Sequence, residues 1–95
     1  MSRLDQARAA INAVDAQMAK LFCQRMEAVK EIADYKQEQN LPVLDQTREE
    51  EVLKRNLSVY PDPETERLYE GFLLNLMELS RQYQQSFRNE NSDHQ

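Results

Sequence analysis

The stretch LDQARAAINAVDAQMAKLFCQRMEAVKEIADYKQEQ, residues 4–39, determines the fold class of this chain. It contains no glycine and no proline, and most of its residues are good helix formers, so it predicts one uninterrupted α-helix. At ~1.5 Å per residue this helix is on the order of 50 Å long, whereas a compact domain of this size is roughly 30 Å across. In a monomer half of its apolar stripe would face water, so we expect two chains to pair along these helices.

The segment QNLPVLD, residues 39–45, ends the long helix. Pro42 disfavours helical geometry at the residue before it and has no N–H to donate. Asp45 can then serve as the N-cap of a second, short helix, which we expect over residues 46–60.

The segment YPDPETE, residues 60–66, predicts the end of the second helix and the start of a third, with Asp62 as N-cap and Pro63 at the first helical position. A third helix of medium length is expected from 63 to about 87, followed by a frayed tail over 88–95. The sequence therefore predicts an all-α fold of three helices in a single domain spanning residues 1–95.

Composition excludes several classes of protein. The net charge of -5 and the pI near 4.8 argue against a nucleic-acid-binding protein, which needs a basic surface. The N-terminus lacks the apolar region of a signal peptide, and no segment approaches the ~20 apolar residues of a membrane span. The single cysteine excludes an internal disulfide and fits a reducing compartment, so we expect the cytoplasm. The only histidine, His94, lies in the predicted tail, and we expect no metal site.

Polar residues interrupt the apolar face of each predicted helix. On the first helix that face is an apolar stripe at helical spacing, formed by Ile11, Val14, Met18, Leu21, Val29 and Ile32. Seven polar residues fall on or beside the three apolar faces: Arg8, Arg25, Lys36, Arg48, Glu49, Ser80 and Gln84. Any one of them alone is more often a snorkelling side chain or a satisfied polar group of the core.

Together these seven residues bring four cations, one acid and two neutral groups to the core, and burying the excess positive charge unpaired would be costly. We interpret them as a site for a small dianionic ligand between the helices, since the planar guanidinium of arginine matches a carboxylate. Asp45 is equally well explained as a plain N-cap or as a ligand contact, and the two roles are compatible.

Several kinds of chemistry lack their components. The sequence contains no Ser-His-Asp set, Cys-His pair, glycine-rich phosphate loop or metal-ligand spacing. We therefore expect no cofactor, and any reaction would proceed by positioning and electrostatics alone.

Three motifs in order resemble the all-helical class of chorismate mutases. They are RAAINAVD at residues 8–15, PVLDQTREEEV at 42–52 and ELSRQYQQ at 78–85, with Arg25 and Lys36 standing between the first two. The match extends from about residue 4 to 87. The resemblance implies conversion of chorismate to prephenate, an isomerisation in phenylalanine and tyrosine biosynthesis.

The resemblance also implies an intertwined homodimer with two active sites, in which the long first helices pair. The residue matching Arg8 crosses into the site of the other subunit and binds one substrate carboxylate, and the residue matching Arg25 binds the other. The residues matching Lys36 and Gln84 donate to the ether oxygen of the substrate.

The remaining roles concern the rest of the substrate. The residues matching Asp45 and Glu49 hold its ring hydroxyl, and those matching Arg48 and Ser80 support its orientation. By resemblance, catalysis is assigned to Arg25, Lys36, Glu49 and Gln84. Chorismate rearranges in one unimolecular step, so no covalent intermediate is needed.

Two other interpretations remain open. The first is an isochorismate-pyruvate lyase, which has a similar helical fold and a similar set of cations but lacks the acidic position of the second helix. Glu49 and Asp45 therefore favour the mutase. A non-catalytic helical dimerisation module would use the polar set for interface specificity. It would show no thermal shift with a dicarboxylate, whereas a binding site would be stabilised by mass action. The short chain favours a free-standing mutase.

Overall fold

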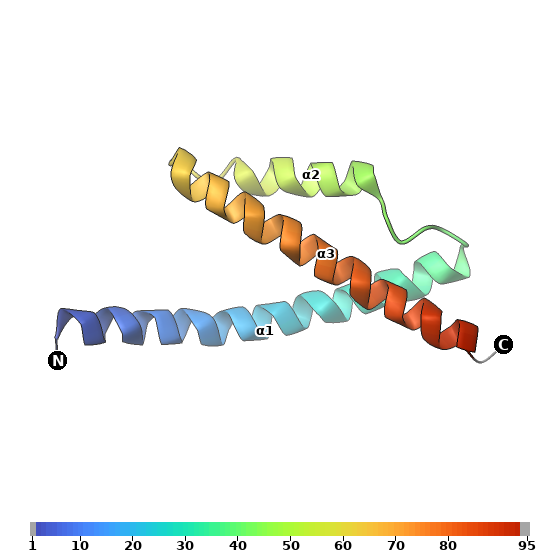
Figure 1. Cartoon of the computed structure of the whole chain (residues 1–95), viewed down its shortest axis with the longest axis horizontal. Coiled ribbons are helices and arrows are strands. Elements are labelled where there is room, and N and C mark those ends of the chain that lie inside the picture. Colours follow the sequence, from blue (N-terminus) through green and yellow to red (C-terminus); the bar gives the residue numbers. More distant parts are fainter. Residues whose placement is uncertain (1, 94–95) are drawn as a thin grey trace.

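The computed structural model describes residues 2–93 of the chain, and side chains up to residue 88. Within this range it consists of three α-helices and no strand: α1 (Arg3–Glu38), α2 (Gln46–Leu57) and α3 (Pro63–Asp93) (Figure 1). The predicted all-α fold with one long, one short and one intermediate helix is thereby confirmed. His94, on which the expectation about metals partly rested, lies outside the described residues.

Each helix begins at a residue whose side chain can accept a hydrogen bond. Oxygens of Ser2, Asp45 and Asp62 each accept from the backbone N–H three residues further on, at 3.0 Å. These bonds satisfy N–H groups that have no partner inside a helix. The hydroxyl of Thr65 and then its N–H also lower the pKa of Asp62, because both donate to the ionised carboxylate. The predicted N-caps at Asp45 and Asp62 are confirmed.

The end of α1 depends on Asn40 as well as on Pro42. Asn40 has a positive φ of 57°, a conformation that asparagine tolerates better than most residues. The N–H of Leu41 donates to the Lys36 carbonyl at 2.7 Å, and that of Asn40 donates to Gln37 at 3.2 Å. This pair of bonds is a Schellman motif, which turns the chain back toward the last turn of α1.

The second helix is shorter than predicted. We expected it to run to residue 60, but α2 ends at Leu57. Pro61 disfavours helical geometry at Tyr60, whose N–H instead closes a turn onto the Leu57 carbonyl at 3.3 Å. The ring of Tyr60 packs against that of Tyr69 in α3, with centroids 4.9 Å apart.

The third helix is longer than predicted. We expected it to end at about residue 87, but α3 continues to Asp93. Residues 88–93 contain neither glycine nor proline, so nothing in them breaks a helix. The Arg88 guanidinium also donates to the Leu41 carbonyl, which ties this part of α3 to the loop after α1. Residues 94–95 of the predicted tail lie outside the described range.

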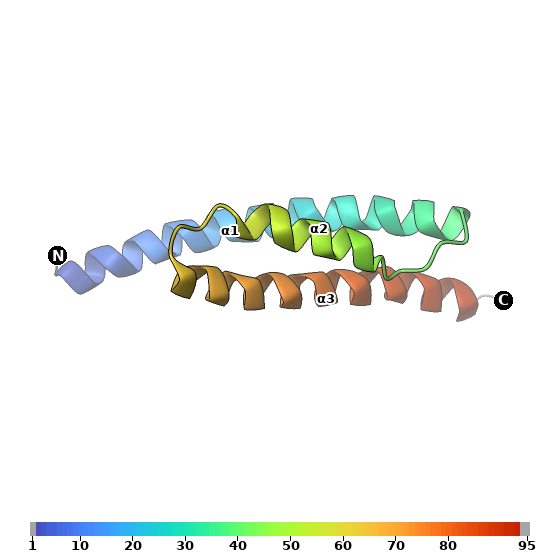
Figure 2. The ribbon, with the colours of Figure 1, turned by 90° about the horizontal axis from the view of Figure 1, so that it is seen from above.

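Helix α3 packs against both of the other helices, on the C-terminal half of α1 and on α2. The buried apolar residues are Val29 and Ala33 of α1 and Leu73 and Met77 of α3. The N-terminal end of α1 projects beyond the other helices in both views (Figures 1 and 2). The radius of gyration of the Cα atoms is 17.2 Å, whereas a compact chain of this length has one of ~12 Å. The core of the single chain is therefore small.

Helix α1 leaves large apolar side chains exposed along the stripe that the sequence predicted. They include Ile11, Val14, Met18 and Leu21, each between 46% and 61% exposed. None of the helices within residues 2–93 is long and apolar enough to cross a membrane. The exposed stripe lacks a packing partner in the single chain.

We predict that Leu73→Ala lowers the free energy of unfolding by about 2–5 kcal/mol, because it leaves a cavity in the small core. Urea unfolding at one fixed protein concentration measures this. Leu73 is 4% exposed and its neighbour Leu74 is 48% exposed. Leu74→Ala is therefore the control and should cost less than about 1 kcal/mol. Equal losses in the two variants would contradict the assignment of the core.

Candidate functional site

A hydrogen bond joins α1 to α3 at the centre of the predicted site. Nη1 of Arg25 donates to Oγ of Ser80 at 2.5 Å, and Oγ of Ser80 donates to the Leu76 carbonyl at 2.9 Å. Ser80 is only 6% exposed. Its one proton is used within α3, so its oxygen can act only as an acceptor for the arginine. Ser80 thus orients the Arg25 guanidinium, whose remaining N–H groups are left available to a ligand.

Gln84 lies one turn after Ser80 on the same face of α3, and it is 7% exposed. Its Oε1 atom has no hydrogen-bond partner among the described residues. A buried polar atom without a partner costs about 1–3 kcal/mol. The Gln84 amide is therefore a group for which this chain alone provides no complete set of partners.

Lys36 is half-buried in the last turn of α1, and its Nζ donates to the Val43 carbonyl at 2.8 Å. The chain reversal at Asn40 brings that carbonyl within reach. An ammonium group has three donors, so two remain after this bond. The bond fixes the position of the cation without neutralising its charge.

Glu49 contacts a residue that the sequence did not lead us to expect. Nη1 of Arg81 in α3 lies 2.6 Å from Oε1 of Glu49 and 2.5 Å from its Oε2. The side chains of Glu49 and Arg81 are 25% and 33% exposed, respectively. One feature of the sequence could have suggested a partner on another helix. No lysine or arginine stands three or four residues from Glu49, so α2 itself offers no cation to pair with its carboxylate.

Three of the predicted residues stand apart from these contacts. Asp45 caps α2 through the Arg48 N–H, and Arg48 forms a surface ion pair with Glu51 at 3.6 Å. The side chains of that pair are 54% and 58% exposed, so the pair contributes little to stability. Arg8 is exposed in α1, near the end of the helix that projects beyond the other two (Figures 1 and 2), and no described contact joins it to the other site residues.

The site carries uncompensated positive charge. Among the side chains that the structure describes, neither Arg25 nor Lys36 forms an ion pair with a carboxylate, while Glu49 is already paired with Arg81. Within residues 2–93 no group of histidine, cysteine, aspartate and glutamate is arranged to hold a metal ion. An anion is the ligand that this arrangement favours.

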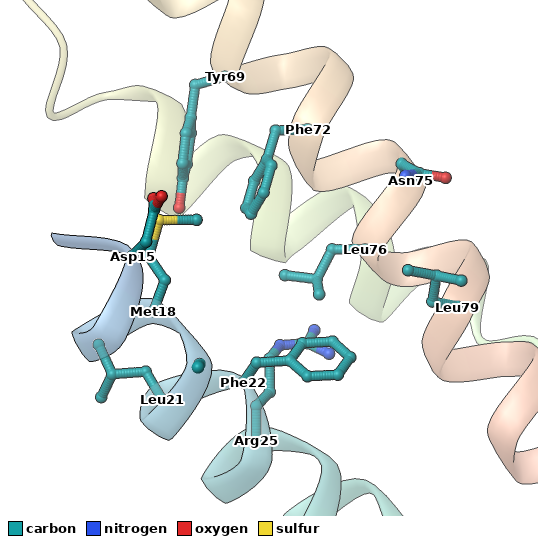
Figure 3. A pocket seen from close by; sticks show the side chains of 11 residues that line it. Asp15, Met18, Leu21, Phe22, Arg25, Tyr69, Phe72, Asn75, Leu76 and Leu79 are labelled. Carbon is teal, nitrogen blue, oxygen red and sulfur yellow. The ribbon is translucent and has the colours of Figure 1, made fainter. Parts of the chain in front are cut away.

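Beside this polar set, α1 and α3 enclose an open cleft of about 810 Å³. Figure 3 shows Met18 and Phe22 of α1 facing Phe72 and Leu76 of α3 across it, with Arg25 at one end. Most of its lining is apolar, which does not suit a small dianion. Arg25 is the only predicted site residue in its lining, so the cleft adjoins the polar set but is a different feature.

The family model described as chorismate mutase type II matches residues 7–85 of the chain. The matched segment contains all the site residues predicted from the sequence, from Arg8 in α1 to Gln84 in α3. No curated protein matches the chain. The family match covers most of the sequence and agrees with the resemblance carried by the three motifs.

Proposed function

The chain belongs to the chorismate mutase type II family and is a chorismate mutase, an isomerase, and from this premise we propose how its residues act on chorismate. The observation that carries the proposal is the uncompensated charge of Arg25 and Lys36 beside the open amide of Gln84. The product is prephenate, and the reaction serves phenylalanine and tyrosine biosynthesis in the cytoplasm.

The reaction itself explains why the site needs neither a nucleophile nor a metal ion. In chorismate a C–O bond breaks while a C–C bond forms within the same molecule, so no proton has to be transferred. The enzyme must hold an extended dianion in a chair-like conformer and stabilise the negative charge that grows on the ether oxygen. Both tasks require fixed hydrogen-bond donors and cations.

Arg25 binds one carboxylate of the substrate. One N–H of the Arg25 guanidinium donates to the Ser80 hydroxyl, and this bond fixes the direction of the guanidinium. The remaining N–H groups of Arg25 can form two parallel bonds to a carboxylate. Ser80 therefore supports substrate orientation through Arg25. Arg48 in α2 also supports substrate orientation. Its surface ion pair with Glu51 is weak, so leaving Glu51 to contact the substrate costs little free energy.

Lys36 and Gln84 donate to the ether oxygen. The Lys36 ammonium keeps two donors after its bond to Val43, and its charge interacts more strongly with the transition state than with the ground state. The two ends of the Gln84 amide have nearly the same shape, so a rotation about χ3 exchanges its unpartnered oxygen for the Nε2 donor.

Glu49 and Asp45 hold the ring hydroxyl of the substrate from α2. Glu49 accepts a hydrogen bond from the hydroxyl, and Asp45 lies one turn earlier at the start of the helix. These acidic residues favour the mutase over the isochorismate-pyruvate lyase, because the lyase does not share the acidic hydroxyl-binding position of the second helix.

The enzyme is a homodimer in which the long α1 helices pair. The exposed apolar stripe of α1 and the apolar cleft between α1 and α3 support this, because a second copy of α1 has the length and the apolar side to cover both. Pairing of this kind also gives Arg8 a role. Arg8 is exposed in the single chain, and in the dimer it binds the second carboxylate of the substrate in the active site of the other subunit.

We predict that purified protein converts chorismate to prephenate and that Lys36→Ala lowers kcat by about 10²–10³-fold, since it removes a charged donor from the ether oxygen. Loss of chorismate absorbance with identification of the product measures this. Lys54→Ala, at an exposed position of α2, is the control and should retain activity. Pyruvate and an aromatic acid as products would instead identify the lyase. No consumption of chorismate by folded protein would favour the dimerisation module.

We predict that Gln84→Glu makes activity depend on pH. A carboxyl group can donate to the ether oxygen only when protonated, and the ordinary pKa of a glutamic acid is ~4.3. The activity of the variant should therefore increase as pH falls from 8 to 5, whereas the parent should show no such increase. Full activity of the variant at pH 8 would place residue 84 away from the ether oxygen.

We predict that Arg8→Ala and Lys36→Ala each inactivate the enzyme but complement one another when mixed. In a mixed dimer one site receives Arg8 and Lys36 from different parent chains and is intact, while the other lacks both. Half of the dimers formed on random exchange are mixed and each has one of two sites intact, so about a quarter of parent activity should return. The readout is chorismate consumption after joint refolding. If no activity returned although mixed dimers formed, each site would take both residues from one chain.

A further inference from the structure

The contact between Glu49 and Arg81 has a geometry suited to more than charge neutralisation. A single nitrogen, Nη1 of Arg81, lies within hydrogen-bond distance of both carboxylate oxygens, at 2.6 and 2.5 Å. A carboxylate offers about four lone-pair positions, two on each oxygen. The contact uses one side of the carboxylate, so Glu49 can still accept a hydrogen bond from another group.

The position of Glu49 depends strongly on this contact. Helix α2 contains no buried residue, and its apolar side chains Val52, Leu53 and Leu57 are only half-buried. A free glutamate side chain also has several rotamers, and holding it in one of them costs conformational entropy. Arg81, in the turn of α3 that also contains Ser80, supplies an anchor for the Glu49 carboxylate.

We propose that Arg81 is a positioning residue for the reaction: it holds the Glu49 carboxylate from across the α2–α3 interface in the orientation that receives the ring hydroxyl of chorismate. This rests on the proposed function, in which Glu49 binds that hydroxyl. Arg81 acts through Glu49 and does not itself touch the substrate. Since Arg81 and Ser80 are consecutive in α3, one turn of this helix orients both Glu49 and Arg25.

The test compares Arg81→Met with the parent on two substrates, chorismate and a chorismate analogue whose ring carries no hydroxyl. For chorismate, kcat/KM should fall on the order of tenfold to a hundredfold, as expected when a substrate-binding group loses its orientation. For the analogue, kcat/KM should change by less than about threefold, because Glu49 has no hydroxyl to bind. The ratio of the two kcat/KM values is independent of the fraction of protein that is folded.

Two further variants control the comparison. Arg81→Lys keeps a cation that can reach one Glu49 oxygen, so it should recover part of the loss for chorismate. Arg67→Met removes the arginine of an exposed ion pair with Glu64 in the first turns of α3, where the N···O distance is also 2.6 Å, and should leave the ratio unchanged. Equal losses on both substrates for Arg81→Met would overturn the proposal, since Arg81 would then support only the fold. No loss on either substrate would overturn it as well.

Glu49→Ala, which removes the acceptor oxygens of this side chain, separates failure of this inference from failure of the proposed function. If Glu49→Ala leaves kcat/KM for chorismate unchanged, Glu49 does not bind the hydroxyl, and both the assignment and the inference are wrong. If Glu49→Ala lowers kcat/KM selectively for chorismate while Arg81→Met does not, only the role of Arg81 is wrong. A selective loss in both variants, with little further loss when they are combined, supports the coupling of the two residues.

Discussion

Positive charge on the packed face of α1 is the constraint on which the rest of the structure depends. Arg25 and Lys36 belong to the half of α1 that lies against the remainder of the chain, and neither is paired with a carboxylate among the described side chains. Such cations are costly to bury unless fixed dipoles and a ligand compensate them. The Ser80 hydroxyl and the Val43 carbonyl supply the dipoles. In the proposed function the dianionic substrate supplies the missing charge.

The extent of α1 has a second consequence, for assembly. A helix of 36 residues is far longer than the contact that α3 makes with it, so the single chain has an extended shape and a small core. In the proposed homodimer the same helix provides apolar surface for pairing in one half and cations for catalysis in the other. Folding, dimerisation and completion of the site would then be coupled, since Arg8 belongs to the half that pairs.

The sequence predicted what depends on local chemistry. The lack of any helix breaker before Asn40 predicted α1, and the capping residues Asp45 and Asp62 predicted where α2 and α3 begin. Helical periodicity likewise brought Ser80 and Gln84 to the inner face of α3, where both are buried. Each of these features is determined by residues within a few positions of one another.

The sequence did not predict what depends on the crossing of helices. Arg81 was missed because the adjoining residue of α3, Ser80, occupies the apolar face, and only the approach of α2 shows that Arg81 meets Glu49. The extension of α3 to Asp93 was missed because a polar, non-periodic segment predicts a loop, although the Arg88 contact with Leu41 gives it a tertiary partner. The role of Arg8 depends on a second chain and stays a prediction.

The hydrogen bonds of the site divide its residues into two kinds. Ser80, Asp45 and Glu49 have acceptor atoms that are bonded within the chain, which fixes their direction before any ligand arrives. By contrast, Arg25 and Lys36 keep unused donors, and the Gln84 amide has an unpartnered atom. In the proposed function this is the division that catalysis by preorganisation requires: orienting groups are satisfied by the fold, and groups that stabilise charge remain open to the substrate.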